Sequence, residues 1–117
     1  MYSQKLLDHF HHPRNVGEIA EATIVVATYN PVCGDLLKFW AVVRNGRIVD
    51  ITFKVQGCVP AVACASWLTE KVKGKQRPEV AGLTPEQIEA GLGGLPSASH
   101  HAAVLACESL QKLLAAM

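Results

Sequence analysis

The sequence has few aromatic side chains, little excess charge and no long apolar run, and each shortage argues against a class of protein. Aromatic residues make up 6% of the 117 residues and the net charge is +1. A basic surface with interleaved aromatics is therefore missing, which argues against a nucleic-acid partner. No apolar run approaches the roughly 20 residues of a membrane span. Residues 1–8 lack the layout of a signal peptide, so we expect a cytoplasmic protein with no membrane partner.

Cysteine is too scarce for a disulfide-stabilised scaffold. The chain has four cysteines, Cys33, Cys58, Cys64 and Cys107, and it is rich in Ala, Val and Leu, so we expect reduced thiols. Half of the residues are hydrophobic, and a chain of this length buries a sizeable core without disulfides. We therefore expect a single domain that spans residues 1–117.

Strand signals occupy the first half of the chain. Residues 22–29 are mostly β-branched, without Gly or Pro, and residues 36–44 alternate between apolar and polar positions. The alternation resumes in residues 47–56 after Asn45-Gly46, a pair typical of a type I′ hairpin turn. It predicts Val49, Ile51, Phe53 and Val55 on the covered face and Ile48 on the other face. The sequence thus predicts an antiparallel meander of three strands with one covered face.

Helix signals flank these strands. Four segments carry them: residues 2–10, residues 61–73 after Pro60, the capping box at residues 84–87 with a helix to residue 90, and the apolar pattern from residue 98 onward. Helices that follow an antiparallel meander pack on one side of its sheet. We therefore expect an α+β fold in which a three-stranded antiparallel sheet packs against helices.

A candidate metal site follows from this predicted topology. Cys33 and Asp35 lie two residues apart in the loop between the first two strands, and Cys58 follows the third strand. Both positions fall at the same end of a meander, and His101 lies in the first turns of the last helix. Cys58 also precedes a helix N-terminus, which favours thiolate over thiol. Two sulfurs, one nitrogen and one carboxylate suit Zn²⁺ or an iron-sulfur cluster.

Each of these residues also has a plainer interpretation. Cys64 and Cys107 lie among apolar residues of helices and are best read as core side chains. Asp35 follows a glycine and could serve turn chemistry, and His101 could be an ordinary helix histidine. Spacing alone leaves the metal site and these alternatives about equally supported.

Four motifs in order carry a family resemblance over nearly the whole chain. They are residues 8–17 (DHFHHPRNVG), residues 30–35 (NPVCGD), Gly57-Cys58 with Ala61 and Ser66, and Leu95-Pro96 with His101 and residues 104–106. The chain resembles the IscU/NifU N-terminal iron-sulfur scaffold family. The resemblance implies a labile [2Fe-2S] cluster or Zn²⁺ on scaffold cysteines, the nearby Asp and a His, with sulfur from a cysteine desulfurase. It also implies a carrier rather than an enzyme, with apo iron-sulfur proteins as recipients.

The sequence departs from the family pattern at two places. The family has His-Cys near the start of the last helix, where this chain has His101-Ala102, so one scaffold thiol is missing. The chaperone-recognition run Leu-Pro-Pro-Val-Lys is replaced by residues 95–99 (LPSAS), which argues against recognition by the family's ATP-dependent chaperone. The family's remaining site residues are Cys33, Asp35, Cys58 and His101, which still number four.

Two functions fit these residues. The leading hypothesis is an iron-sulfur cluster scaffold or carrier in which Cys33 and Cys58 are thiolate ligands, His101 is a nitrogen ligand and Asp35 is an exchangeable ligand. The alternative is a protein that has lost cluster assembly and acts as a zinc-binding sulfur acceptor or regulatory partner of a cysteine desulfurase. A structural zinc domain ranks last because the core is sufficient without metal. The sequence leaves open the native metal, the oligomeric state and the recipient proteins.

Overall fold

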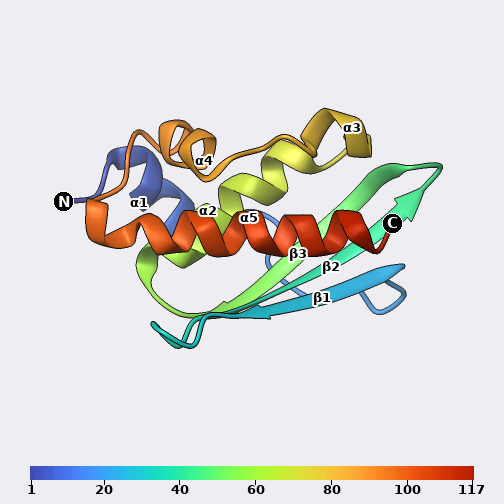
Figure 1. The fold of residues 1–117 in the computed structure, drawn as a ribbon, viewed down its shortest axis with the longest axis horizontal. Helices are drawn as coiled ribbons and strands as arrows, with labels where there is room; N and C mark the ends of the chain where they lie inside the picture. Colours follow the sequence, from blue (N-terminus) through green and yellow to red (C-terminus); the bar gives the residue numbers. More distant parts are fainter.

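The chain forms a sheet layer and a helix layer, shown in Figure 1 for a computed structural model that describes residues 1–117. Strands β1 (Ile24–Tyr29), β2 (Leu36–Arg44) and β3 (Arg47–Gln56) form an antiparallel sheet in the order β1-β2-β3. Asn45 and Gly46 both have positive φ between β2 and β3, as a type I′ turn requires. The predicted α+β class is confirmed.

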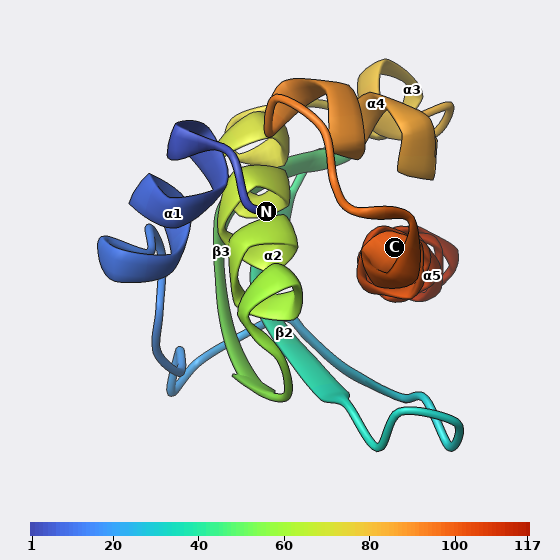
Figure 2. The ribbon, with the colours of Figure 1, turned by 90° about the vertical axis from the view of Figure 1, so that its left-hand side faces the viewer.

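The helices cover one face of this sheet. They are α1 (Gln4–His11), α2 (Val59–Val72), α3 (Arg77–Val80), α4 (Pro85–Gly91), the 3₁₀ helix η1 (Ser97–Ser99) and α5 (His100–Ala115). Helix α2 packs along β3 and α5 packs along β1 and β2, while α1 lies against α2 and α4 lies against α5 (Figures 1 and 2). The single turn α3 was not predicted. None of these helices is long and apolar enough to cross a membrane.

One hydrophobic core joins the two layers. It is a cluster of 25 buried residues, enough to hold the fold without a covalent cross-link, and all four cysteines are free. Its largest fully buried side chains include Phe39, Phe53, Leu37, Ile48, Ile51, Leu68, Leu110 and Leu113. A core of this size agrees with the prediction of reduced thiols.

The β2–β3 hairpin contains a β-bulge that the alternation did not predict. The register shifts after Val42, so that Val42 pairs with Asp50 whereas Val43 pairs with Ile48. Val49 is the extra residue, and the strand changes the side to which its side chains point at this position. Ile48 is therefore fully buried and Val49 only partly buried. The predicted faces of these two residues were wrong.

A buried cluster of polar side chains connects α1 with α2. His9 Nδ1 lies 2.7 Å from Ser66 Oγ, and the backbone N–H of Arg14 donates to the same oxygen at 3.0 Å. His9 is 7% exposed and Ser66 is fully buried. Burial lowers the pKa of His9 below 6.5, and the Arg14 guanidinium lowers it further, against the opposing effects of Glu70 and Asp8.

This lowered pKa makes the stability of the protein sensitive to mild acid. Since the unfolded chain binds a proton at His9 more readily than the folded chain, the free energy of unfolding falls as the pH drops below about 6.5. Urea unfolding at about pH 7.5 and about pH 5.5 measures this loss. The loss is expected to be smaller in His9→Gln than in the wild type. An equal loss in both proteins would contradict the assignment to His9.

Candidate metal and cluster site

The hairpin register brings the predicted site residues to one end of the sheet. Leu36, the first residue of β2, pairs with Gln56, the last residue of β3. Asp35 and Gly57 are therefore neighbours, and Cys58 follows as the residue before α2. The N-terminus of α5 meets the same end, so the last helix supplies His101. We call Cys33, Asp35, Cys58 and His101 the four-donor site.

The donor atoms of this site are close together. Ligand atoms of Cys33, Asp35 and His101 lie within 4.8 Å of one another. Cys58 Sγ lies 3.4 Å from Asp35 Oδ2 and 3.8 Å from His101 Nε2, and the latter two atoms are 3.9 Å apart. Neighbouring sulfur, nitrogen and oxygen ligands on a tetrahedral zinc ion are about 3.3 to 3.8 Å apart. Cys58 does not belong to the group whose ligand atoms all lie within 4.8 Å, so a side-chain movement is needed before all four donors share one ion.

Asp35 is the buried member of the four-donor site. It is 4% exposed, and its carboxylate contacts Cys58 and His101, whereas the Cys33 thiol is exposed. A Cβ on Gly57 would come within 2.6 Å of both Cγ and Oδ1 of Asp35. The carboxylate therefore occupies space that only a glycine at position 57 leaves free. No local pattern in the sequence predicts this contact, because it joins a loop to the end of another strand.

The orientation of His101 is fixed by the backbone that precedes it. His101 Nδ1 lies 3.0 Å from the carbonyl oxygen of Ala98 in η1. A carbonyl can only accept, so Nδ1 carries the proton and Nε2 is left with a free lone pair. Since Nε2 is the atom that faces Cys58 and Asp35, the imidazole presents its ligating nitrogen to the other donors.

The protonation of Cys58 differs from the sequence-based prediction. Burial raises the pKa of the Cys58 thiol and the Asp35 carboxylate adds to this effect, although a hydrogen bond from the backbone N–H of Ala61 lowers the pKa. The helix N-terminus therefore acts in the predicted direction but is outweighed. A metal ion can reverse this balance, because its positive charge deprotonates a coordinating thiol.

The other two cysteines lie elsewhere in the core. Cys64 is fully buried in α2, and burial raises its pKa strongly. Cys107 Sγ lies 3.7 Å from the carbonyl oxygen of Leu83, and burial raises the pKa of Cys107 to about 11. Neither belongs to the four-donor site. Ala102, at the position of the missing scaffold thiol, is 1% exposed and supplies no donor.

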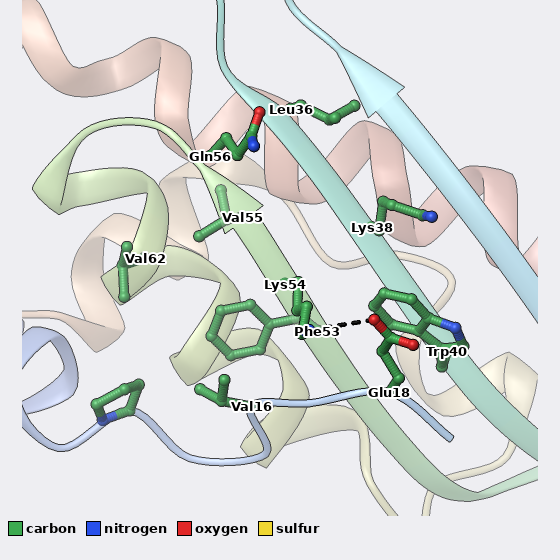
Figure 3. Close-up of a pocket in the computed structure, with 11 residues that line it drawn as sticks. Val16, Glu18, Leu36, Lys38, Trp40, Phe53, Lys54, Val55, Gln56 and Val62 are labelled. Atoms are coloured by element: carbon green, nitrogen blue, oxygen red, sulfur yellow. Dashed lines mark hydrogen bonds and ion pairs between the residues drawn. The ribbon is translucent and has the colours of Figure 1, made fainter. Parts of the chain in front are cut away.

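A hollow of about 430 Å³ beside β3 is a different feature (Figure 3). Residues from β2, β3, α2 and the segment after α1 surround it, and the ion pair of Glu18 and Lys54 lies at its rim, at 3.1 Å. Its lining contains no Cys, His or Asp. This hollow therefore offers no donor set comparable with the four-donor site.

Replacing Gly57 with alanine should weaken metal binding without unfolding the protein. The backbone of Gly57 is not in the left-handed region, so the new methyl group acts only by pushing the Asp35 carboxylate away. We expect the Kd for Zn²⁺ to rise by about 10- to 100-fold, measured by competition with a chelating dye. Gly82→Ala, whose Cβ would meet nothing within 4 Å, is the matched control. Equal affinities in the two variants would disprove the positioning role.

Together the fold and the donor set define a small α+β protein with sulfur, nitrogen and oxygen donors gathered at the end of its sheet, a set of the kind that can hold a metal ion or a metal cluster. Comparisons with known proteins narrow this class. The chain matches the NifU-like N terminal domain family over residues 1–116. The chain belongs to this family, and the resemblance seen in its motifs is confirmed.

Two relatives of this chain are named as scaffold proteins. The chain is 43% identical over 114 residues to the iron-sulfur cluster assembly scaffold protein IscU 1 of Archaeoglobus fulgidus, covering 97% of this chain and 74% of that protein. It is 44% identical over 111 residues to the protein of the same kind, IscU, from Aquifex aeolicus, covering 93% and 71%.

A solved structure shares the fold. The crystal structure of the N-terminal part of a nitrogen-fixing NifU-like protein from Brucella abortus superposes with a TM-score of 0.81 at 17% sequence identity. The superposition covers 97% of this chain and 92% of that one. At this identity the likeness concerns the fold alone.

Proposed function

We propose that this chain is an iron-sulfur cluster assembly scaffold whose cargo is held at the four-donor site. The observation that carries the proposal is the convergence of Cys33, Asp35, Cys58 and His101 at one end of a NifU-like fold. Residues 1–117 form a single domain of this family, and the protein works as a cytoplasmic carrier rather than as an enzyme.

The cargo that fits best is a labile [2Fe-2S] cluster. Such a cluster needs four protein ligands, two for each iron, and the site offers four donors. Nitrogen ligands are compatible with a [2Fe-2S] centre, as Rieske-type sites use two histidines. The carboxylate of Asp35 is a harder ligand than thiolate and holds iron-sulfur iron less strongly. A cluster with one such ligand is weakly held, which suits transfer to an apo acceptor protein.

Each residue has its own part in this function. Cys33, the exposed thiol, accepts sulfur from a cysteine desulfurase: its thiolate attacks the outer sulfur of the enzyme's persulfide, and the enzyme's thiolate leaves. The half-buried Cys58 supplies the second thiolate ligand. His101 binds through Nε2, because its Nδ1–H donates a hydrogen bond to the carbonyl oxygen of Ala98. Asp35 is the ligand that exchanges when the cargo leaves.

The partners follow from this chemistry. A cysteine desulfurase supplies sulfur, and apo iron-sulfur proteins receive the cluster. The family's dedicated ATP-dependent chaperone is not an expected partner, because residues 95–99 lack the second proline and the lysine of its recognition run.

A second candidate function is a zinc-binding sulfur acceptor or regulatory partner of a desulfurase. Two observations favour it: Ala102 replaces the third scaffold thiol, and the ligand atoms of Cys58, Asp35 and His101 lie 3.4 to 3.9 Å apart, close to the spacing of ligands on one tetrahedral ion. Zinc satisfies such a site without inorganic sulfide. In this alternative the chain receives sulfur or modulates the desulfurase but assembles no cluster.

Anaerobic reconstitution separates the two candidates. Metal-stripped protein is incubated with Fe²⁺ and sulfide, desalted, and examined by visible absorption and by analysis of iron, sulfide and zinc. The scaffold function predicts a sulfide-to-iron charge-transfer band with iron and sulfide in equal amounts. Absence of the band, together with tight binding of one zinc ion per chain, would refute the scaffold function in favour of the alternative. Persulfide on Cys33 or Cys58 after incubation with a desulfurase and cysteine would then distinguish a sulfur acceptor from a regulatory partner, which should carry none.

A further inference from the structure

A second group of metal-ligating side chains lies outside the four-donor site, on α4 and the first turn of α5. Ligand atoms of Glu86, Glu89 and His100 all lie within 4.8 Å of one another. We propose that these residues bind a divalent first-row transition cation, and that Fe²⁺ is the ion they take in a cluster scaffold. We call them the carboxylate site.

The donor types and their spacing fit such a cation. Carboxylate is a hard ligand and imidazole is an intermediate one. Two carboxylates and one imidazole therefore suit Fe²⁺, Mn²⁺ and Co²⁺ better than they suit soft metals. His100 Nδ1 and Glu89 Oε2 form a hydrogen bond at 2.8 Å, and a bound ion would take the place of its proton with the two atoms about 3 Å apart, as neighbouring ligands on an octahedral ion are. Glu86 is exposed, so its side chain is free to close on the ion, and water would fill the remaining positions.

The charges around the carboxylate site favour a cation. Glu86 and Glu89 lie three residues apart on α4, where like charges repel. No Lys or Arg forms an ion pair with either residue, and His100 is the only ion-pair partner of Glu89. A divalent cation held between the two carboxylates would offset this repulsion.

The site joins α4 to the first turn of α5. The first turn of α5 has no side-chain cap, since neither Ser99 nor Pro96 forms a capping hydrogen bond. Between α4 and η1 the chain contains Gly93 and Gly94, both with positive φ. An ion held by α4 and by His100 would therefore restrain the turn of α5 in which His101, a member of the four-donor site, is the next residue.

This position gives the carboxylate site a role that rests on the proposed function. A scaffold consumes Fe²⁺, and oxygen and nitrogen donors hold this ion without committing it to sulfur. From there Fe²⁺ passes to the thiolates of the four-donor site as their protons are released, with no change in oxidation state. The carboxylate site thereby raises the local supply of iron where the cluster forms.

Titration with Co²⁺ alone tests the binding. Cobalt bound through thiolate gives an intense sulfur-to-metal band, whereas cobalt bound by oxygen and nitrogen does not. For the full chain we expect two classes of Co²⁺ in calorimetry, only one of which produces the sulfur band. Glu89→Gln and His100→Asn should each raise the Kd of the second class by at least about tenfold and leave the sulfur band intact. Glu79→Gln, an exposed carboxylate of α3 outside both sites, should change neither class.

Two results would overturn the proposal. One is a wild-type titration with no class of Co²⁺ other than the one that produces the sulfur band. The other is a second class that Glu89→Gln and His100→Asn leave unchanged. Either result would reduce the contact of Glu89 with His100 to an ordinary ion pair.

The role in iron supply has a separate readout. The initial rate of cluster formation in Glu89→Gln should fall several-fold when Fe²⁺ is limiting and equal the wild-type rate when Fe²⁺ is saturating. Equal rates at both iron levels would refute the supply role. If the wild type forms no cluster at all, the scaffold function fails, while the Co²⁺ titration still decides whether the carboxylate site exists.

Discussion

Cys33→Ala and Cys58→Ala are each expected to abolish the charge-transfer spectrum of the reconstituted protein and to raise the Kd for Zn²⁺ by at least about 100-fold. Each change removes one of only two thiolates in the four-donor site. One thiolate then remains beside Asp35 and His101, which are harder ligands that hold iron-sulfur iron less strongly than thiolate does. Visible absorption after reconstitution and a zinc competition assay measure the two effects.

Cys33→Ala is the cleaner of these two tests. The Cys33 side chain is exposed, so its loss creates no cavity in the core. Cys64→Ala is the control, because it removes a fully buried thiol of the same size from α2 and leaves the four-donor site complete. This control should lose stability and keep the spectrum. A normal spectrum in Cys33→Ala and Cys58→Ala would mean that the cargo is held by other residues.

Ala102→Cys is expected to convert a weakly held cluster into a firmly held one. The substitution places a third thiolate at the position where the family carries one, next to His101 in the first turn of α5. A soft thiolate can then replace the carboxylate of Asp35 as a ligand of iron-sulfur iron. We expect the half-life for cluster transfer to an apo acceptor to lengthen by at least about tenfold. The decay of the visible band after addition of the acceptor measures this half-life.

The position of Ala102 calls for a matched control. Ala102 is 1% exposed, so an added sulfur atom also overfills the core, at a cost of about 1 to 3 kcal/mol. Ala106→Cys adds the same atom to an equally buried position one helical turn further along α5, away from the four-donor site. Thermal unfolding should show similar losses for both variants, with slower transfer only in Ala102→Cys. Unchanged transfer in Ala102→Cys would show that the missing thiol does not explain the weak ligation.

The fold could be predicted because its main signals are local. Alternation, the Asn45-Gly46 turn and Pro60 near the start of α2 each act within a few residues. The β-bulge after Val42 could not be predicted this way, because it depends on which residues of β2 and β3 become partners. Helix α3 is a single turn that begins next to a bridge between Gln76 and Arg47, a contact between distant parts of the chain.

The candidate site was predictable to a similar degree. A meander places the β1–β2 loop and the end of β3 at the same end of the sheet, regardless of which side chains they carry. The proximity of Asp35 and Cys58 could therefore be predicted from the topology. The protonation of Cys58 did not, because burial depends on the finished structure and outweighs the local helix terminus. The space that Gly57 leaves for Asp35 and the carbonyl that orients His101 are likewise contacts of the folded state.

The donors of the four-donor site come from three segments, at residues 33–35, 58 and 101, and meet only in the folded chain. A cargo held there would therefore cross-link the loop between β1 and β2, the start of α2 and the start of α5. By mass action, a metal ion at about 100 times its Kd adds about 2.7 kcal/mol to the free energy of unfolding. The linkage between ligand binding and folding also acts in the opposite direction. A partner that separates the first turn of α5 from the sheet would weaken the binding of the cargo to all four donors together. On the proposed function, a local opening at the N-terminus of α5 would then be enough to release the cargo, without separate displacement of each ligand.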